Sequence, residues 1–254
     1  GTPEFLAETI AAAKQMTKKS LLFRMDSGND ALENMLLLHW HDPQLKFLIK
    51  HNFRREDRFT IAEELKTVCQ NVKHPRDGKA VYIGSTWRNF ETEKDGSFAI
   101  RMVYEITERT TAADGQEMLF PETEIDMYWT SLGVSDEEVI ALYHNHAVCE
   151  QYHSEIKTDM GIERLPSGKF ETNALILKLT MIAYNILRII GTAAMKGNDM
   201  PVRHSTIKRR RIRTVIDNLI LLAGHLTDHA RKLQLALGHS NGWICTFLRI
   251  AEAF

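Results

Sequence analysis

Four side chains near the middle of the chain have the chemistry that binding a phosphate ester requires. Tyr143, His146, Glu150 and Lys157 stand at offsets of 0, 3, 7 and 14 residues. At about 100° per residue, one α-helix would hold all four directions within roughly 60° of one another. Its face would present an aromatic hydroxyl, an imidazole, a carboxylate and an ammonium group. An ordinary solvated face mixes charges in the same way, and on spacing alone that plainer interpretation is favoured.

A second carboxylate, Asp26, directly follows the apolar segment 20–25, which is predicted to be a strand. In an α/β sheet, the carboxyl ends of strands are where such folds bind ligands. The sequence Asp-Ser-Gly at 26–28 is also a good turn, in which the Asp side chain bonds its own backbone. Taken alone, Asp26 is more simply a turn residue.

Asp26 and Glu150 together indicate a metal site, because a strand-end carboxylate and a helix carboxylate can converge on a divalent cation. Mg²⁺ (or Mn²⁺) prefers a few carboxylates together with water and phosphate oxygens. Two such ions about 4 Å apart activate a water or 3′-hydroxyl and stabilise the leaving oxygen in phosphodiester chemistry. Lys157 would then neutralise phosphate, and Tyr143 would hold a nucleotide by stacking or hydrogen bonding.

The elements that must position Asp26 alternate between helix and strand. Hydrophobic periodicity predicts helices over 4–18, from Asn29 or Asp30 to Leu38, and over 59–72. Strands are expected at 20–25 and 45–51. This order predicts an α/β domain with parallel strands.

The pattern changes after residue 73. Three segments, 81–87, 98–109 and 124–132, are rich in β-branched and aromatic residues, and Asp114-Gly115 is a hairpin turn signal between the last two. Residues 74–132 are therefore predicted to be a β-rich insertion.

The segment that carries Glu150 is predicted to be helical. Ser135 and the acids after it are typical of a helix start, and this helix is expected to run from 136 to about 160. A turn at 165–168, a buried apolar helix at 173–193 and an amphipathic helix at 212–237 are expected to follow.

A basic run lies near the C-terminus of a chain whose 254 residues have a formal net charge of −1. Lys208, Arg209, Arg210 and Arg211 suit contacts with a DNA backbone, although a solvated helix start is the plainer alternative. Lys169, in the tight turn Leu-Pro-Ser-Gly-Lys, could approach a phosphate as well.

The cysteines and the apolar segments indicate a cellular compartment. Cys69, Cys149 and Cys245 are widely spaced and form no Cys-x-x-Cys motif, which argues against a disulfide framework or a cysteine zinc site. We see no signal peptide and no uninterrupted apolar run of about 18 residues, so a cytoplasmic protein with no membrane partner is expected.

The motifs together resemble the DDE class of bacterial insertion-sequence transposases, in the branch with the signature Tyr-x-x-Arg-x-x-x-Glu-x-x-x-x-x-x-Lys. Tyr143, Glu150 and Lys157 match this signature in register. The sequences of residues 149–175 and of 21–30 (LLFRMDSGND) are also similar to those of these transposases, and the resemblance covers nearly the whole chain.

The resemblance implies an RNase H-like α/β core that lacks its first strands, with a β-rich insertion and a helical C-terminal region. The implied domains are 1–73, first part of the core; 74–132, insertion; 133–200, core helix with the catalytic Glu and the helix after it; and 201–254, basic helical region.

The family's functional residues carry over to this chain by position. Asp26 would be the second metal-binding acid and Glu150 the third, while Tyr143 and Lys157 would contact DNA near the scissile phosphate. In the insertion, Trp87 and Trp129 are candidates for managing a distorted base, although a core role suits both equally.

Two departures from the family pattern matter. His146 stands where the signature has Arg, so its grip on phosphate should be weaker and pH-dependent. The first acid of the triad is missing, because no Asp on a strand precedes Asp26. The 254-residue chain alone is therefore expected to be inactive, with a sticky sheet edge where strands are absent.

The implied activity is metal-dependent DNA nicking and strand transfer at transposon ends. The implied partners are transposon terminal inverted repeats, target DNA and a second copy of the chain in a synaptic complex, in the bacterial cytoplasm at the nucleoid. Two alternatives stay open: an RNase H-like nuclease without strand transfer, and a decayed, non-catalytic DNA-binding fragment.

Overall fold

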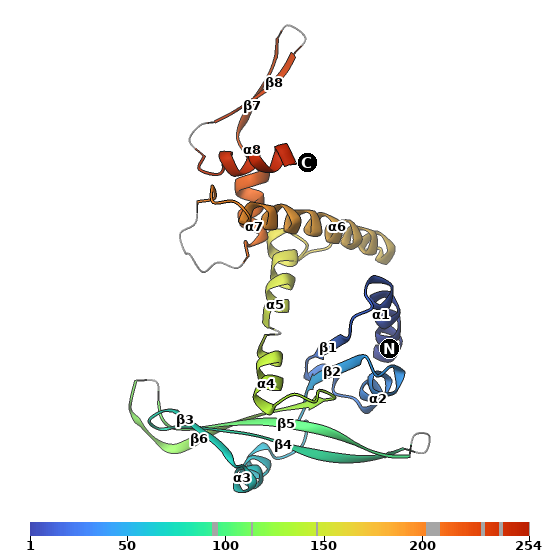
Figure 1. The fold of residues 1–254 in the computed structure, drawn as a ribbon, viewed down its shortest axis with the longest axis vertical. Coiled ribbons are helices and arrows are strands. Elements are labelled where there is room, and N and C mark those ends of the chain that lie inside the picture. The colour runs from blue at the N-terminus through green and yellow to red at the C-terminus, as the bar shows by residue number, and fades with distance from the viewer. Residues whose placement is uncertain are drawn as a thin grey trace. The chain divides into compact units, whose positions relative to one another are not determined.

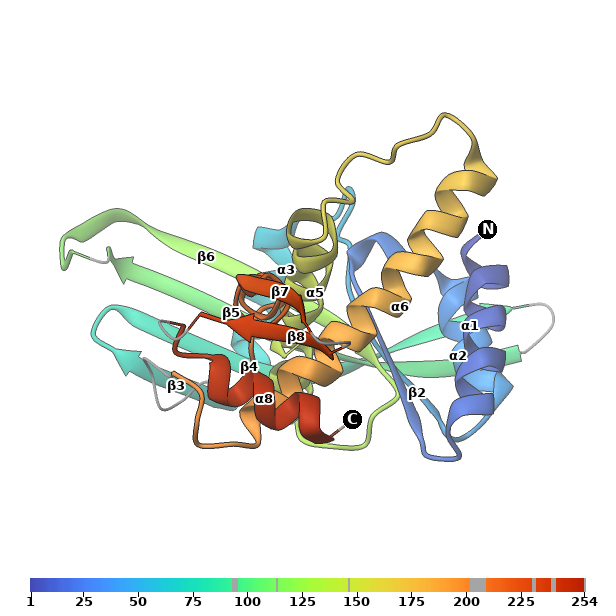
Figure 2. The same cartoon turned by 90° about the horizontal axis from the view of Figure 1, so that it is seen from above.

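The computed structural model describes residues 1–92, 96–112, 114–145, 147–201, 209–229, 232–238 and 241–253. The chain divides into two compact units, Gly1–His146 and Ala147–Phe254, and each is described by itself. Figure 1 and Figure 2 show the elements of both units from two directions.

The N-terminal unit has helices and strands in mixed order. Its elements are α1 (Thr2–Met16), β1 (Leu21–Met25), a 3₁₀ turn (Ser27–Asn29), α2 (Leu32–His41), β2 (Leu45–Lys50), α3 (Arg58–Val68), β3 (Asn71–Arg76), β4 (Lys79–Thr92), β5 (Gly96–Thr111), β6 (Glu117–Thr130) and α4 (Asp136–His144).

All six strands form one sheet in the order β1-β2-β6-β5-β4-β3. β1 and β2 are parallel, as expected, and every other neighbouring pair is antiparallel. Strands from within 74–132 therefore continue the sheet that β1 and β2 begin. The α/β class predicted from the sequence is confirmed, with β1 at one edge of the sheet.

Alternation along the strands gives this sheet two apolar faces. In β5, Met102 and Ile106 belong to one core cluster, whereas Val103 belongs to the other. The first cluster packs against α1, α2 and α3, and the second packs against α4. Figure 1 accordingly shows α3 and α4 on opposite sides of the long strands. Period-two patterning thus places the sheet between two helical layers.

The C-terminal unit is smaller and mostly helical. Its elements are α5 (Ala147–Ser154), a π-helix (Glu155–Asp159), α6 (Phe170–Met195), α7 (Ile212–Val215), a second π-helix (Ile216–Ile220), β7 (Gly224–His229), β8 (Lys232–Leu237) and α8 (Ile244–Ala253). Its core gathers α6, α7 and α8 around Trp243, and Figure 2 shows α8 alongside α6.

Several sequence predictions hold. The helices at 4–18 and 173–193 appear as α1 and α6, and the strands at 20–25 and 45–51 appear as β1 and β2. The Asp114-Gly115 turn is also confirmed, because Gly115 has a φ of +88° and its N–H donates to Ala112 O over 3.1 Å. A positive φ of this size is the conformation that favours glycine.

Two helix predictions in the N-terminal unit have wrong boundaries. The helix expected at 59–72 ends at Val68, and the strand β3 begins at Asn71. The second helix is capped by Ala31 and not by Asn29 or Asp30, because the Asp30 carboxylate is bonded elsewhere.

The helix predicted at 212–237 is wrong beyond residue 220. A two-stranded hairpin, β7–β8, follows. Leu233, Leu235 and Leu237 of β8 recur at every second residue, which is the strand period, and a glycine, Gly224, begins β7.

The expectation of a buried helix at 173–193 is also corrected. Among the described residues, most large apolar side chains of α6 are exposed, because the short α7 and α8 pack against its C-terminal half. By length and composition alone, α6 could cross a membrane, a property that it shares with core helices of soluble proteins.

Candidate active-site carboxylates

Asp26 follows β1 and shapes the turn that comes after it. Its Oδ1 accepts hydrogen bonds from Gly28 N at 3.1 Å and from Asn29 Nδ2 at 2.7 Å. The turn interpretation of Asp26 is thus seen directly. Both bonds use the same oxygen, and the described residues offer no hydrogen bond to Oδ2. Because Asp26 is exposed, this second oxygen can still serve a cation.

The turn that carries Asp26 is tied to the segment that follows β2. Asn52 Nδ2 donates to Ser27 O at 3.3 Å, and Asn52 N donates to Asp30 Oδ2 at 2.7 Å. Arg54 Nη2 donates to Asp30 O at 2.6 Å. The two segments meet because β1 and β2 are parallel neighbours, so their carboxyl ends lie at the same edge of the sheet.

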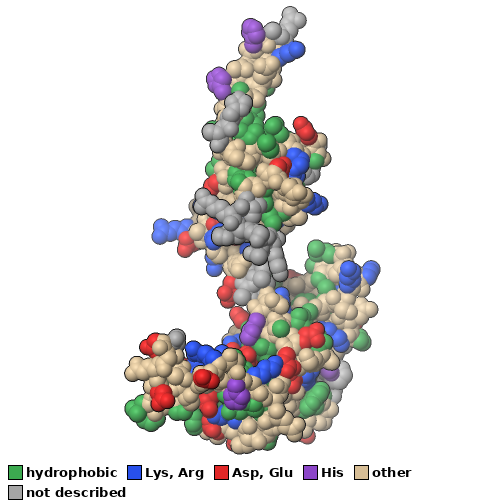
Figure 3. Space-filling view, turned by 60° about the vertical axis from the view of Figure 1, so that its left-hand side comes forward, with side chains coloured by type: hydrophobic (Ala, Val, Ile, Leu, Met, Phe, Trp, Pro, Cys, Tyr) green, Lys and Arg blue, Asp and Glu red, His purple; other side chains and the backbone are tan. Residues whose placement is uncertain are grey.

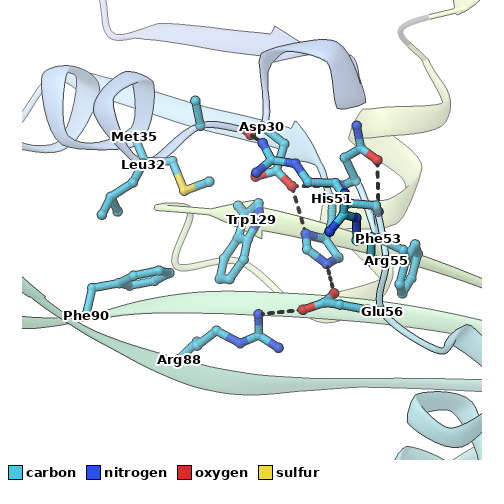
Figure 4. Close-up of a pocket in the computed structure, with 13 residues that line it drawn as sticks. Asp30, Leu32, Met35, His51, Phe53, Arg55, Glu56, Arg88, Phe90 and Trp129 are labelled. Atoms are coloured by element: carbon cyan, nitrogen blue, oxygen red, sulfur yellow. Dashed lines mark hydrogen bonds and ion pairs between the residues drawn. The ribbon is translucent and has the colours of Figure 1, made fainter.

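A buried histidine, His51, lies between two carboxylates beside this turn (Figure 4). Its Nδ1 is 2.8 Å from Asp30 Oδ2, and its Nε2 is 2.7 Å from Glu56 Oε2. Glu56 also pairs with Arg88 at 3.4 Å. Burial opposes charge on the imidazole, but the bonds to Asp30 and Glu56 outweigh it and raise the pKa of His51. His51 is 7% exposed and Asp30 8%.

A cavity of about 560 Å³ opens beside this network. Trp129, Phe90 and Met35 give it an apolar wall, and Arg55 and Arg88 are cationic groups along it (Figure 4).

The two tryptophans that the sequence could not rank are now distinct. Trp129 is 2% exposed and lies within the core, with the Arg88 guanidinium 5.7 Å from its ring centroid. Trp87 is 65% exposed and is therefore the more accessible ring.

Glu150 lies in the first turn of α5, in the C-terminal unit. The side chain is exposed, and the described residues give its carboxylate no hydrogen bond or ion pair. It lines a cavity of about 500 Å³ together with Gln151, Ser154, Glu155, Arg209 and Arg211. Because no described residue pairs with them, the carboxylate oxygens of Glu150 can bind a cation.

The helix that carries Glu150 is fastened to the basic run by buried acids. Glu155 is 1% exposed and accepts from Tyr184 Oη at 2.8 Å and from Arg209 Nη1 at 2.9 Å. Asp159 accepts two bonds from Arg211, at 2.8 and 3.0 Å. Burial opposes ionisation of Asp159, but these bonds and the Arg213 N–H outweigh it and lower its pKa.

The arginines expected to contact DNA therefore have partners inside the protein. Arg209 and Arg211 pair with these acids, and the Arg210 guanidinium lies 5.3 Å from the ring centroid of Trp243. Lys208 lies outside the described residues. On the face shown in Figure 3, basic and acidic side chains are interspersed over the N-terminal unit.

Three of the four side chains expected on one helix face lie in separately assigned helical elements of the described residues. Tyr143 lies near the end of α4, which stops at His144, and Glu150 lies on α5, which begins at Ala147. Asn145 caps α4, and asparagine competes with helix for the backbone. His146 lies outside the described residues. The shared face of the four side chains stays a prediction.

The remaining signature residues have different surroundings. Tyr143 is half-buried, with its ring 4.6 Å from that of Tyr128. Lys157 is exposed, within the π-helix, a form of helix that is frequent at functional sites. Lys169 is exposed before α6, and its N–H donates to Ser167 Oγ at 3.1 Å. That N–H is thereby already engaged.

Hard oxygen ligands fit Mg²⁺ or Mn²⁺, and both exposed carboxylates supply them. Among the described residues, no three His, Cys, Asp or Glu side chains come together as a ready-made metal cluster. Asp26 and Glu150 are thus candidate ligands individually.

Sequence reasoning missed His51, Glu56 and Arg54. One signal was available, since His51 ends a predicted strand that runs parallel to the strand just before Asp26. The pairing of Glu155 with Arg209 had no such signal, because 54 residues separate them.

A search of curated proteins found no match. The sequence does match the family model described as transposase DDE domain group 1, over residues 4–253. This match confirms the resemblance to DDE transposases, and the mixed sheet with its helices is consistent with their RNase H-like core. The chain therefore belongs to the DDE transposase family.

Proposed function

We propose that this chain is the part of a bacterial insertion-sequence transposase that nicks DNA at transposon ends and transfers the strand to target DNA. The observation that carries this proposal is the pair of exposed carboxylates, Asp26 and Glu150, each with at least one oxygen free of described partners. Membership of the DDE family supports the same roles.

In the proposed reaction, Asp26 and Glu150 are ligands of Mg²⁺ or Mn²⁺. When bound, such ions activate a water or 3′-hydroxyl and stabilise the leaving oxygen. Lys157 neutralises a DNA phosphate. We propose further DNA contacts by Tyr143, His146, Lys169 and the basic run 208–211. In the basic run, the donors that are not used in internal ion pairs make these contacts.

A third carboxylate is needed to complete the family's triad. Asp26 is the first aspartate in the sequence, and the only acids before it are Glu4 and Glu8 in α1. We propose that the 254 residues alone do not nick DNA, and that an active transposase supplies the first acid from elsewhere. We also propose that residues 74–132 correspond to the family's insertion, that the enzyme acts as a homodimer on paired terminal inverted repeats, and that it does so at the bacterial nucleoid.

The test is nicking of a labelled transposon-end duplex by an active transposase that carries residues 1–254. Asp26→Asn and Glu150→Gln should each lower the rate about 10³-fold or more, because metal-assisted stabilisation of the transition state is among the largest contributions to catalysis. Asp26→Asn keeps an oxygen for Gly28 N and Asn29, so it separates metal binding from turn formation. Glu163→Gln, in an exposed loop of the C-terminal unit, is the matched control.

Wild-type nicking in either carboxylate variant would refute the role of that residue. Joined products on a labelled target duplex distinguish a transposase from a nuclease that cannot transfer strands. DNA binding without nicking under any metal would indicate a decayed, non-catalytic fragment.

A further inference from the structure

The turn that bears Asp26 is held at one end by a histidine that the proposed function does not use. Asp26 begins the turn and Asp30 ends it. The carboxylate of Asp30 is buried and points to His51 and to Asn52 N, not to solvent. The position of the turn therefore depends on what His51 and its neighbours offer to Asp30.

With Asp30 and Glu56 ionised, as their lowered pKa values favour, the bonding of His51 requires two protons on its ring. A neutral imidazole has one N–H donor, and its other nitrogen is an acceptor. Here both ring nitrogens face carboxylate oxygens, at 2.8 Å for Asp30 and 2.7 Å for Glu56. Two ionised carboxylates are acceptors only, so both contacts are hydrogen bonds only when the ring is an imidazolium.

The charged surroundings of the ring come from three elements. Asp30 faces it from the turn, Glu56 from the segment after β2, and Arg88 of β4 contacts the far oxygen of Glu56. Arg54 binds the backbone of Asp30. The rings of Phe53 and Trp129 pack edge-on against the imidazole, at 4.9 and 5.5 Å between centroids. They add no charge.

We propose that His51, as an imidazolium, is a positioning residue for Asp26, holding the Asp26–Asp30 turn in place by bridging Asp30 to Glu56. Loss of the proton leaves one of the two carboxylates facing a lone pair and loosens the turn. This inference rests on the proposed function, because it gives His51 a part in catalysis only if Asp26 is a metal ligand.

The raised pKa of His51 gives the direction in which pH changes the position of the turn. The pKa of His51 is raised above its ordinary 6.5, so the bridge is complete below pH 6.5 and is lost as pH rises through the raised value. An ordinary buried ion pair that merely stabilises the fold would not link this titration to the turn at Asp26.

The first arm of the test uses the 254-residue chain labelled with ¹⁵N. Long-range ¹⁵N–¹H spectra report the protonation of both His51 nitrogens, and hydrogen exchange reports the amides of Gly28 and Asn52, corrected for intrinsic rates. Both nitrogens should carry protons at pH 6.5, and protection of the two amides should fall with the same midpoint as His51. A neutral ring at pH 6.5, or protection that ignores the titration, overturns the proposal.

Two variants sharpen this arm. Glu56→Gln keeps an oxygen for Nε2 but removes a charge at a partly exposed position, so it should lower both midpoints together without unfolding the unit. His74→Gln, at an exposed site in β3, should change neither midpoint. If Glu56→Gln moves the His51 midpoint and leaves amide protection unmoved, His51 does not position the turn.

The second arm measures the pH profile of nicking in an active transposase that carries this chain. The rate should fall about tenfold per pH unit above the His51 midpoint, and Glu56→Gln should shift that falling limb to lower pH. An unshifted limb overturns the positioning role. Asp26→Asn separates the two ideas: if it nicks normally, the proposed function fails even where the first arm succeeds.

Discussion

The segments that carry Asp26 and Glu150 are stabilised by two different types of cationic side chain. In the N-terminal unit, the turn of Asp26 depends on His51, whose pKa is raised above 6.5 by its bonds to Asp30 and Glu56. In the C-terminal unit, the helix of Glu150 is fastened through Glu155 and Asp159 to Arg209 and Arg211, which keep their charge at any physiological pH. One support can therefore be released as pH rises through the raised pKa of His51, and the other cannot.

This difference also changes the interpretation of the basic run. A cluster of arginines in a sequence predicts binding of an external anion, but here Arg209 and Arg211 also bind internal ones. The acids Glu155 and Asp159 are buried, and the arginines that meet them compensate the cost of that burial. Basic clusters next to a helix with buried acids can thus be structural.

The largest effect is expected from removing the buried acid of the C-terminal unit. Glu155→Ala leaves Arg209, the Tyr184 hydroxyl and the N–H of Ile212 without their acceptor. It should destabilise this unit by about 3–5 kcal/mol, measured by hydrogen exchange of its core amides. Glu163→Ala, at an exposed position, should change the free energy of opening by less than about 0.5 kcal/mol. Equal effects would refute the fastening role of Glu155.

A smaller effect is expected from pH, and it separates the two supports. The pKa values of Asp30 and Asp159 are both lowered from 3.8, so both supports are present above that pH and are lost as pH falls through the lowered values. Only the N-terminal support should also weaken above pH 6.5, as His51 loses its proton.

The amides of Asn52 and Arg213 report this contrast, because each donates to one of these aspartates, at 2.7 and 3.2 Å. After correction for intrinsic exchange, Asn52 should lose protection at both ends of the pH range and Arg213 only in acid. A loss of protection at the Arg213 amide at alkaline pH would contradict this difference between the two supports.

The smallest effect on stability is expected from exchanging the arginine that binds Asp159 for lysine. Arg211→Lys keeps the charge but loses the two parallel bonds to Asp159. Because Arg211 is half exposed, solvent screening keeps the loss of stability in chemical denaturation well below that of Glu155→Ala. Arg164→Lys, at an exposed position, should cost close to nothing, and a matching loss there would show that the forked geometry is unimportant.

Richness in β-branched and aromatic residues predicted three strands of the sheet, because the segments 81–87, 98–109 and 124–132 overlap β4, β5 and β6. The predicted helix boundaries were wrong where tertiary hydrogen bonds outweigh local preference. For example, the Asp30 carboxylate, which could have capped α2, binds His51. The end of α4 at His144 was missed, because the prediction of that helix rested on the signals at its start. Candidate site residues could be named from motif spacing, but their partners lie far along the chain and leave no local signal.

The central claim is that Asp26 and Glu150 bind the divalent cations of a DDE transposase. Paramagnetic broadening by Mn²⁺ in the ¹⁵N-labelled chain tests it without requiring catalysis. The amides around Gly28 and around Gln151 should broaden first, with Asp26→Asn protecting the former and Glu150→Gln the latter, whereas Glu163→Gln protects neither. Broadening that centres elsewhere, or that neither carboxylate variant changes, would contradict the account.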